Sequence, residues 1–319
     1  MATPILNWES RIGRRLKLRD LHILFTVVQW GSMAKGAAHL GMSQPAVSEA
    51  IASLEAALRV RLLDRSPRGI EPTIYADALL KRGHVVFDEL KQGIRDIEFL
   101  ADPTTGEVRI GCPESMAAGF VPAIIDRLSR RYPQIAVHVV VAPTGEQEFR
   151  ELRERSVDLM LGRLLKPLSD EDMDIEVLAE DAFFVVAGAG SPWARRKKIA
   201  LAELSNEPWI LFPANSVTGF YVAEAFRAND VEVPRQSVTS FSLEVRMHLL
   251  ATGRYLTILQ GSVLRFNAKP WLLKALPVDL CIPPVPMGVF TLKNRTVSPV
   301  VQLFIEYARE VAKSMTKSR

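Results

Sequence analysis

The chain has 319 residues, of which 48% are hydrophobic and 24% are charged, with a formal net charge of +4 at pH 7. This composition is ordinary for a soluble globular protein of two or three domains that needs no disulfide staples. Because no signal-peptide pattern and no run of eighteen apolar residues occurs, we expect a cytoplasmic protein without membrane contact.

Positive charge is concentrated toward the N-terminal end. Residues 1–82 hold twelve Lys and Arg against seven Asp and Glu, so the remaining 237 residues carry about one net negative charge. A polyanionic partner is therefore expected to bind the N-terminal part. The basic extension over residues 1–17 is either an arm that contacts phosphate or a solubilising tail.

The two cysteines, Cys112 and Cys281, lie far apart and show neither CxxC nor Cys/His spacing. This pattern favours two buried thiols over a metal site. The sequence leaves a redox pair open as the alternative.

Three helices are predicted between residues 18 and 58. Apolar residues at helical spacing predict the first helix, and Gly31 ends it. Ser32 can cap a short second helix, and Ser43 can cap a third helix with Pro45 in its first turn. Two capped helices joined by a tight turn are typical of proteins that place a helix in DNA.

The third predicted helix has two different faces. An apolar face that packs against the domain carries Val47, Ile51, Leu54 and Leu58. A small, polar face that is free to meet an outside partner carries Gln44, Ser48, Ala52 and Glu55.

Residues 59–73, RVRLLDRSPRGIEPT, alternate arginine with apolar residues and contain a Pro-Arg-Gly turn signal. This pattern predicts two short strands joined by a turn, which together form a wing. Residues 75–101 return to a helical period with an apolar stripe. A second copy of the chain is the simplest cover for this stripe, and packing on the helix's own domain is the alternative. Residues 101–107 are expected to be a linker.

Beyond residue 106, short β-branched runs alternate with helical segments. The runs are EVRIGC, AVHVVVA, VDLMLG, DAFFVVAGA, PWILFP, SVTSF, YLTIL and GVFTLK. Such alternation indicates α/β units with mostly parallel sheets, in which ligands bind beyond the carboxyl ends of the strands. We expect two subdomains, with the chain crossing between them near Lys166 and near Leu276.

These features together resemble the LysR-type transcriptional regulators. The resemblance is carried by Gly31-Ser32, Ala37-Ala38, Leu40, Ser43-Gln44-Pro45-Ala46-Val47-Ser48, Ile51, Leu54-Glu55 and Leu62-Leu63-Asp64-Arg65. It is highly specific over about residues 18–80 and looser over the rest, through VPAIIDRLSRRYPQIAV, VDLMLG and LATGRYLTIL. The sequence departs from the family at Arg59, where a glycine is usual, and after Thr73, where a common glycine is missing.

The resemblance implies a fold and a set of domains. A winged helix-turn-helix would span residues 18–74, a linker and dimerisation helix 75–105, and an effector-binding domain 106–319. The effector-binding domain would resemble a periplasmic binding protein, with subdomain I over 106–165 and 277–319 and subdomain II over 166–276.

The resemblance also implies function and partners. The family's members bind double-stranded promoter DNA and a small-molecule inducer, assemble as homodimers or homotetramers, and act on RNA polymerase. They often control catabolic operons, so we expect such a target here, with no catalytic residue, metal or cofactor.

DNA contacts are expected at the third helix and the wing. Gln44 can pair with adenine, Pro45 can meet a thymine methyl group, and Ser48 can donate or accept a hydrogen bond. Glu49 either accepts from cytosine N4 or is an exposed or ion-paired glutamate. Phosphate contact is implied for wing arginines, and the predicted caps complete the set: Arg61, Arg65, Arg68, Ser32 and Ser43.

Effector contacts are expected where polar or aromatic residues follow the predicted strands. In the family such strand ends line a cleft between two subdomains. The candidates are Glu114, Ser115, Thr144, Arg163, Asn215, Ser240 and Phe241. The Ser115 hydroxyl and nearby N–H groups could bind a carboxylate or hydroxyl, and a plain helix cap is the alternative.

Two other protein classes fit the sequence less well. A solute-binding protein would explain residues 106–319 but not the first hundred. An enzyme on the same α/β frame lacks support, since the five histidines show no metal spacing and neither a P-loop nor GxGxxG occurs. Turnover of a metabolite without DNA affinity would favour the enzyme.

Overall fold

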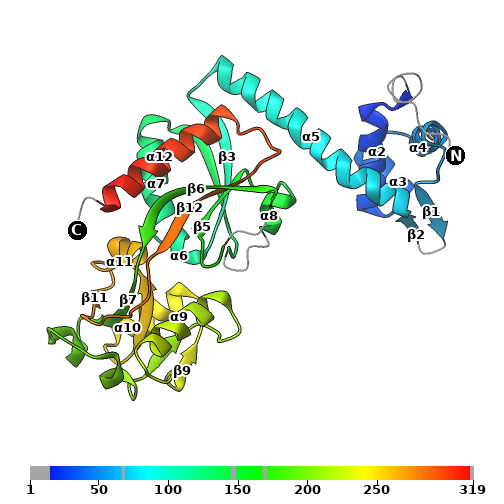
Figure 1. Ribbon diagram of the computed structural model, residues 1–319. Helices are drawn as coiled ribbons and strands as arrows, with labels where there is room; N and C mark the ends of the chain where they lie inside the picture. Colours follow the sequence, from blue (N-terminus) through cyan, green and yellow to red (C-terminus); the bar gives the residue numbers. More distant parts are fainter. Residues whose placement is uncertain (1–14, 67–68, 145–148, 168–170, 317–319) are drawn as a thin grey trace. The chain divides into compact units, whose positions relative to one another are not determined.

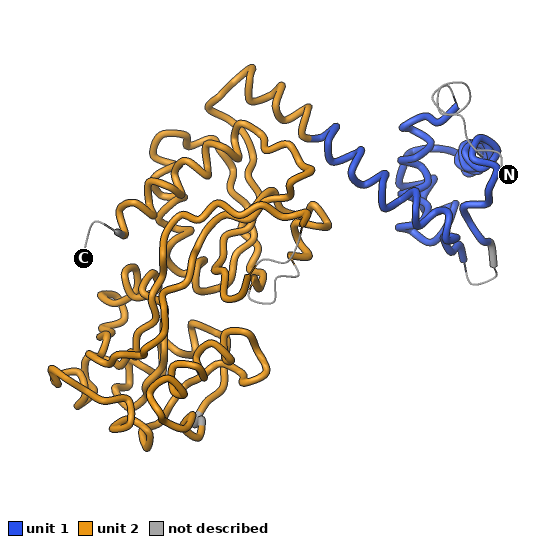
Figure 2. Tube along the Cα trace, in the orientation of Figure 1, with its two compact units in different colours: residues 1–91 blue, residues 92–319 orange. Residues whose placement is uncertain are grey.

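The computed structural model describes residues 15–66, 69–144, 149–167 and 171–316. The chain divides into two compact units, residues 1–91 and 92–319 (Figure 2). Within the described ranges, no helix is both long enough and apolar enough to cross a membrane.

The first unit contains the predicted helices and wing (Figure 1). Its elements are α2 (Leu18–Trp30), α3 (Met33–His39), α4 (Gln44–Leu58), β1 (Leu63–Ser66), β2 (Gly69–Pro72) and the start of α5 (Ile74–Ala101). Strands β1 and β2 pair antiparallel. The helices share one apolar core that includes Leu24, Val47 and Leu54. The expected winged helix-turn-helix architecture is confirmed.

The helix ends follow from local chemistry. Gly31 ends α2 in the left-handed conformation with φ 60°, which glycine adopts at little cost. The Ser32 and Ser43 hydroxyl oxygens accept hydrogen bonds from the N–H groups of Lys35 and Ala46, at 3.5 and 3.4 Å. The two serines are therefore the caps of α3 and α4.

Arg59 ends α4 in the same left-handed conformation, with φ 57°. The family glycine at this position would suit that backbone better, because a Cβ atom is crowded there. Arg59 therefore adopts a conformation that a glycine would adopt at lower steric cost.

The long helix α5 carries an exposed apolar stripe. Ile94 and Ile97 are 58% and 68% exposed. They continue a stripe that includes Val86, Leu90 and Leu100, all exposed as well. Rows of exposed apolar side chains on helices are typical of interaction surfaces.

The second unit holds two five-stranded sheets (Figure 1). The first has the order β4-β3-β5-β12-β6, and the second has the order β11-β7-β10-β8-β9. In each sheet three neighbouring strands pair parallel (β4, β3 and β5; β9, β8 and β10). The next strand, β12 or β7, runs antiparallel to them, and the edge strand beyond it, β6 or β11, pairs antiparallel with that strand. The expected α/β architecture is confirmed, and each sheet is mixed because it also contains antiparallel pairs.

The first sheet consists of β3 (Thr105–Cys112), β4 (Gln134–Val141), β5 (Leu159–Arg163), β6 (Met173–Asp181) and β12 (Val285–Leu292). Its helices are α6 (Glu114–Ala117), α7 (Phe120–Arg131), α8 (Arg150–Arg153) and α12 (Pro299–Thr316). Helices α7 and α12 share the apolar core of one face, with Phe120, Ile124 and Phe304 fully buried. Helix α8 belongs to a separate core with β5 and β12.

The second sheet consists of β7 (Phe183–Gly188), β8 (Trp209–Leu211), β9 (Gln236–Thr239), β10 (Leu256–Gln260) and β11 (Leu273–Ala275). Its helices are η2 (Pro192–Arg195), η3 (Leu201–Leu204), α9 (Val217–Ala228), α10 (Leu243–Ala251) and α11 (Gly261–Asn267). Two apolar cores, one with α9 and one with α10 and α11, cover the sheet.

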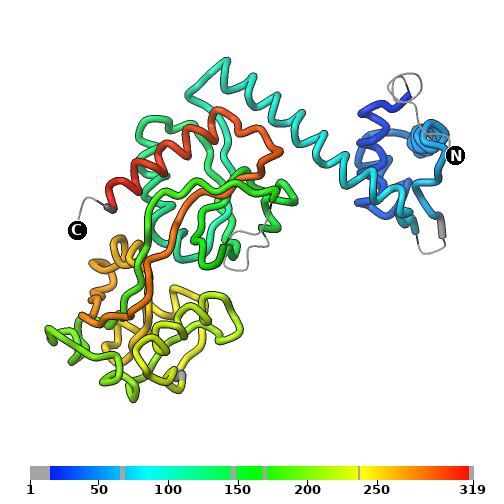
Figure 3. Tube along the Cα trace, in the orientation of Figure 1, coloured from blue at the N-terminus to red at the C-terminus, as the bar shows by residue number. Residues whose placement is uncertain are grey.

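The first crossing between the sheets differs from the sequence expectation. Strand β6, which follows Lys166, pairs with β12 in the first sheet, so the chain crosses at Ala182 instead. It returns just before Val285, later than the expectation near Leu276, because Leu276 and Leu280 still pack in the core of the second sheet. The two crossing segments run side by side (Figure 3). Val285 of β12 pairs with Asp181 of β6.

The two cysteines differ in their surroundings. Cys112 is fully buried at the end of β3, and burial raises the pKa of its thiol to about 11. Cys281 is exposed, so the expectation that both thiols are buried is wrong for this residue. It lies in the segment between β11 and β12, with its Sγ 3.9 Å from Asn229 Oδ1 at the end of α9.

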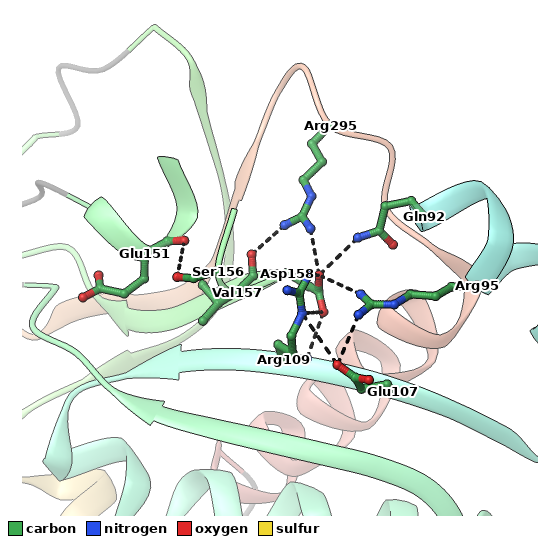
Figure 4. Close-up of polar contacts among 9 residues, drawn as sticks. All are labelled: Gln92, Arg95, Glu107, Arg109, Glu151, Ser156, Val157, Asp158 and Arg295. Carbon is green, nitrogen blue, oxygen red and sulfur yellow. Dashed lines mark hydrogen bonds and ion pairs between the residues drawn. The ribbon is translucent and has the colours of Figure 1, made fainter. Parts of the chain in front are cut away.

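A buried carboxylate, Asp158, fixes the end of α5 to the first sheet (Figure 4). Its Oδ1 accepts hydrogen bonds from Gln92 of α5 (3.3 Å), Arg109 of β3 (2.7 Å) and Arg295 beyond β12 (2.8 Å). Arg95 of α5 lies 3.8 Å away. Burial acts to raise the pKa of Asp158, but the hydrogen bonds and charges of Arg109 and Arg295 hold the pKa below its usual value.

Replacing this carboxylate should destabilise the second unit. Asp158→Asn removes the carboxylate that pairs with the buried guanidinium of Arg295, so we expect a loss of about 3–5 kcal/mol in the free energy of unfolding at pH 7. Since the pKa is lower in the folded state, the stabilisation is present above about pH 4 and disappears as pH falls through the folded pKa. Urea denaturation at a series of pH values measures the effect.

The matched control is Asp126→Asn, which breaks the exposed pair of Asp126 with Arg130 on α7. It should cost at most about 1 kcal/mol. Equal losses in the two variants would contradict the role assigned to Asp158.

Candidate functional site

The first unit presents the start of α4 to the outside. Gln44, Pro45 and Glu49 are exposed and Ser48 is half-buried, while Val47 on the other side of the helix is fully buried. A capped helix whose first turns are exposed beside a wing has the geometry needed to enter a DNA groove.

The remaining predicted DNA contacts lie around this helix. Ser32 is half-buried and its hydroxyl oxygen caps α3, whereas Ser43 is exposed and its hydroxyl oxygen caps α4. Arg61 is exposed just before β1. Arg65 lies in β1, whereas Arg68 lies outside the described residues.

Glu55 has a role that the sequence analysis did not expect. Its Oε1 accepts hydrogen bonds from the backbone N–H groups of Leu62 (2.7 Å) and Leu63 (3.3 Å). Both leucines are buried, so these N–H groups would otherwise lose water without gaining a partner. Glu55 therefore connects α4 to the first strand of the wing, and its assignment to the free outer face is wrong.

The second unit contains a cleft of about 490 Å³ at the carboxyl ends of parallel strands from both sheets. Five of the predicted effector residues line it: Glu114, Ser115, Thr144, Arg163 and Phe241. The sequence analysis did not select several other lining residues, among them Phe212, Ser216, Arg246 and Gln260. A volume of this size is typical of small-molecule sites.

Two predicted effector residues are not among the residues that line the cleft. Asn215 is exposed, and its neighbour Ser216 lines the cleft instead. The Ser240 hydroxyl accepts a hydrogen bond from the Ser242 N–H at 3.1 Å, and its carbonyl accepts one from Arg246 Nε at 3.2 Å. Ser240 thus supports the wall behind the lining residues.

All three nitrogens of the Arg163 guanidinium group donate hydrogen bonds within the fold. Its Nε donates to Asp181 (2.7 Å), its Nη1 to the Ser115 hydroxyl (2.9 Å) and its Nη2 to the Ser262 hydroxyl (2.6 Å). Ser262 also donates through its N–H and hydroxyl to Asp181. The network joins β5, β6 and α6 of the first sheet to α11 of the second, beside the crossing at Ala182.

Glu114 also connects α6, beside the first sheet, to α10, beside the second sheet. Its Oε1 accepts from the Ser242 hydroxyl and from the Glu244 N–H, both at 3.4 Å, at the start of α10. Thr144 is buried against Gly162, where an added Cβ would lie 2.5 Å from the Thr144 hydroxyl oxygen. Glycine at position 162 therefore makes room for Thr144 in the cleft wall.

Comparison with protein families identifies the chain. Residues 18–77 match the family described as bacterial regulatory helix-turn-helix protein, lysR family, and residues 101–313 match the LysR substrate binding domain. The chain belongs to the LysR family. It is a LysR-type transcriptional regulator with a DNA-binding helix-turn-helix and an effector-binding domain. Regulators of this family bind DNA and small-molecule effectors and form oligomers.

Individual relatives agree with the family. The chain is 28% identical to the HTH-type transcriptional regulator GbpR of Azospirillum brasilense over 314 residues, which cover 98% of this chain and 90% of GbpR. It is 27% identical to CysL of Bacillus subtilis over 245 residues, or 77% of this chain and 81% of CysL.

Solved structures of LysR-type regulators share the fold. The crystal structure of CbnR, a LysR family transcriptional regulator, aligns with a TM-score of 0.53 at 21% identity, covering 92% of this chain and 100% of CbnR. Full-length CbnR complexed with its target DNA aligns with the same score and identity, covering 93% and 100%. A full-length OxyR variant from Pseudomonas aeruginosa aligns with a TM-score of 0.62 at 19% identity, covering 93% and 95%.

A sequence signal for Arg246 exists in this regulator. Leu243, Met247 and Leu250 recur at i, i+4 and i+7 and are buried on α10, which predicts the inner face of a helix. Arg246 stands on that same face. An arginine inside an apolar stripe is unusual, because burying its charge is costly, and this makes it a candidate functional residue.

Removing the Glu55 carboxylate should loosen the wing. In Glu55→Ala the N–H groups of Leu62 and Leu63 lose their acceptor, so we expect about 1–3 kcal/mol less protection of these amides. Amide hydrogen exchange of the full chain measures this. Glu49→Ala, on the exposed side of the same helix, is the control and should change protection by less than about 0.5 kcal/mol. Unchanged exchange at residues 62 and 63 would refute the link.

Proposed function

We propose that this regulator binds the promoter of a catabolic operon in the cytoplasm and responds to a small-molecule inducer in the cleft of its second unit. Residues 18–74 contact DNA, 75–105 pair two copies of the chain, and 106–319 bind the inducer and act on RNA polymerase. The cleft binds its ligand without turning it over. The observation that carries the proposal is the exposed, capped start of α4 beside the wing.

The DNA-binding assignment is supported by the different side chains of α4 and the wing, since α4 offers groups that can contact bases and the wing offers positive charge. Exposed Gln44 and Pro45 offer an amide and an apolar edge, which suit base edges in the major groove. Positive charge comes from outside α4, since Arg61, Arg65 and Arg68 belong to the wing and its approach. Phosphate contacts fix position and affinity, whereas base contacts fix sequence preference.

The polar links across the cleft support inducer control. Glu114 and Ser115 belong to α6, beside the first sheet. Glu114 accepts a hydrogen bond from Ser242 at the start of α10, and Ser115 is joined through Arg163 to Ser262 of α11, beside the second sheet. A ligand that enters between these elements competes with or strengthens such links and shifts the relative positions of the two layers. Because Asp158 ties the end of α5 to the first sheet, that shift reaches the linker helix.

Base reading by Gln44 is tested by Gln44→Ala. Loss of the amide should weaken binding to the cognate promoter by roughly 1–3 kcal/mol and change binding to random DNA little. Gel-shift titrations on both DNAs at one salt concentration measure the two affinities. The control is Gln29→Ala, the same change at an exposed position of α2. Equal losses on cognate and random DNA would disprove base reading.

Pairing through α5 is tested by Ile94→Asp. A carboxylate in the middle of a buried helix interface should cost about 3 kcal/mol or more, so the dissociation constant of the dimer should rise roughly a hundredfold. Analytical ultracentrifugation measures the shift toward monomer. Lys81→Asp, exposed on the opposite side of the same helix, is the control and should leave the mass of the assembly unchanged. An Ile94→Asp protein that stays dimeric would contradict the assignment.

A further inference from the structure

The cleft contains a second buried arginine, Arg246 on α10, whose surroundings differ from those of Arg163. Arg246 is 1% exposed and lines the cleft. Its Nε and Nη1 donate to the backbone carbonyls of Ser240 (3.2 Å) and Ile258 (3.4 Å). Its guanidinium carbon lies 3.6 Å from the centre of the Phe212 ring. These partners are neutral.

Part of the Arg246 guanidinium lacks a partner. Its Nη2 is buried and has no hydrogen bond within the described part of the chain. Arg163, which is 5% exposed in the same cleft, has all three of its nitrogens paired, one of them with a carboxylate. Leaving a buried charge without a contacting counter-ion costs stability, so the arrangement of Arg246 suits a ligand rather than the fold.

The charge of Arg246 points to an anionic ligand group. Burial lowers the pKa of Arg246 to about 9, and the charge of Glu114 opposes this shift, so the guanidinium is still charged at neutral pH. A neutral carbonyl oxygen would satisfy the hydrogen bond but not the charge. A carboxylate satisfies both, and such charge-assisted hydrogen bonds are about twice as strong as neutral ones.

The rest of the cleft limits what accompanies that carboxylate. Glu114 places its own negative charge on the wall, where it accepts hydrogen bonds from α10. Arg246 offsets this repulsion for one ligand carboxylate, whereas a second carboxylate would be repelled without that compensation. Many lining residues are apolar, including Val141, Ala142, Pro143, Leu165, Leu243 and Leu259, and they favour an apolar ligand body.

We infer that the effector is a monocarboxylic acid with an apolar body, and that its carboxylate binds the guanidinium of Arg246. This inference rests on the proposed role of the cleft as the effector site. Arg246 is the residue that determines specificity for the acid group, and Glu114 selects against dicarboxylates. Because Nη2 is covered in this state, a small movement of the cleft wall accompanies binding.

The first test uses the unaltered full chain and matched probes. Hexanoate, hexanamide and adipate share a carbon skeleton and differ in charge, as do phenylacetate and phenylacetamide. We expect the monocarboxylates at millimolar concentration to raise the Tm and to bind at least about tenfold more tightly than their amides in calorimetric titration. Adipate should bind more weakly than hexanoate.

Three results would overturn the inference: amides that bind as well as the acids, adipate that binds better than hexanoate, or no Tm shift with any acid at millimolar concentration. Promoter binding by the same protein preparation is measured in parallel. If DNA binding is present while the amides bind equally, the carboxylate assignment fails and the proposed regulatory function stands. Absence of specific DNA binding would instead refute the proposed function.

The second test replaces Arg246. In Arg246→Met the acid-over-amide preference should disappear, and in Arg246→Lys it should persist in part because the charge remains. Arg254→Met, an exposed arginine beyond the end of α10, is the control and should keep the full preference. An undiminished preference for acids in Arg246→Met would refute the role of Arg246.

Discussion

The constraint on which the second unit depends is the burial of one carboxylate, Asp158, between three segments that are remote in the sequence. Water is excluded from this site, so the negative charge is stable only while the guanidinium and amide groups around it stay in place. Those groups come from the end of α5, from β3 and from the chain beyond β12. The linker helix therefore cannot slide along the first sheet without leaving charges unpaired.

The cleft uses two buried arginines in opposite ways. Arg163 is neutralised by Asp181 and held by two serines, so it joins the layers on either side of the crossing. Arg246 is held by two backbone carbonyls and a ring and keeps part of its donor capacity. Two arginines at similar depth thus differ in role, since Arg163 connects the two layers and Arg246 recognises the ligand. The difference is the carboxylate of Asp181, which contacts Arg163 but not Arg246.

Features of the fold that depend on local chemistry were predictable from the sequence. Ser32, Ser43 and Gly31 set the helix ends of the first unit, because capping and left-handed geometry are decided by neighbouring residues. Strand β6 was missed because its sequence, MDIEVLAED, is interrupted by charges. Its partner β12 is more than a hundred residues away, and this missed pairing displaced the first crossing.

The functional sites, like the fold, were predictable where local chemistry decides and not where tertiary contacts decide. Exposure of Gln44 and Pro45 follows from helix periodicity, whereas the engagement of Glu55 depends on the path of the chain after α4. The expectation that ligands bind beyond the carboxyl ends of strands led to five of the cleft residues. It passed over Arg246, because that residue reaches the cleft from a helix. It also could not reveal that Arg163 is satisfied by Asp181, which only the tertiary arrangement brings near.

The contact of Glu55 with the backbone of the wing has an evolutionary consequence. Because backbone groups are the partners, this contact does not depend on which apolar side chains fill the core at positions 62 and 63. Positions 44, 48 and 49 lie outside this contact. A duplicated gene could therefore acquire a new promoter preference by substitutions at these positions alone, while the geometry that presents them to DNA is inherited unchanged.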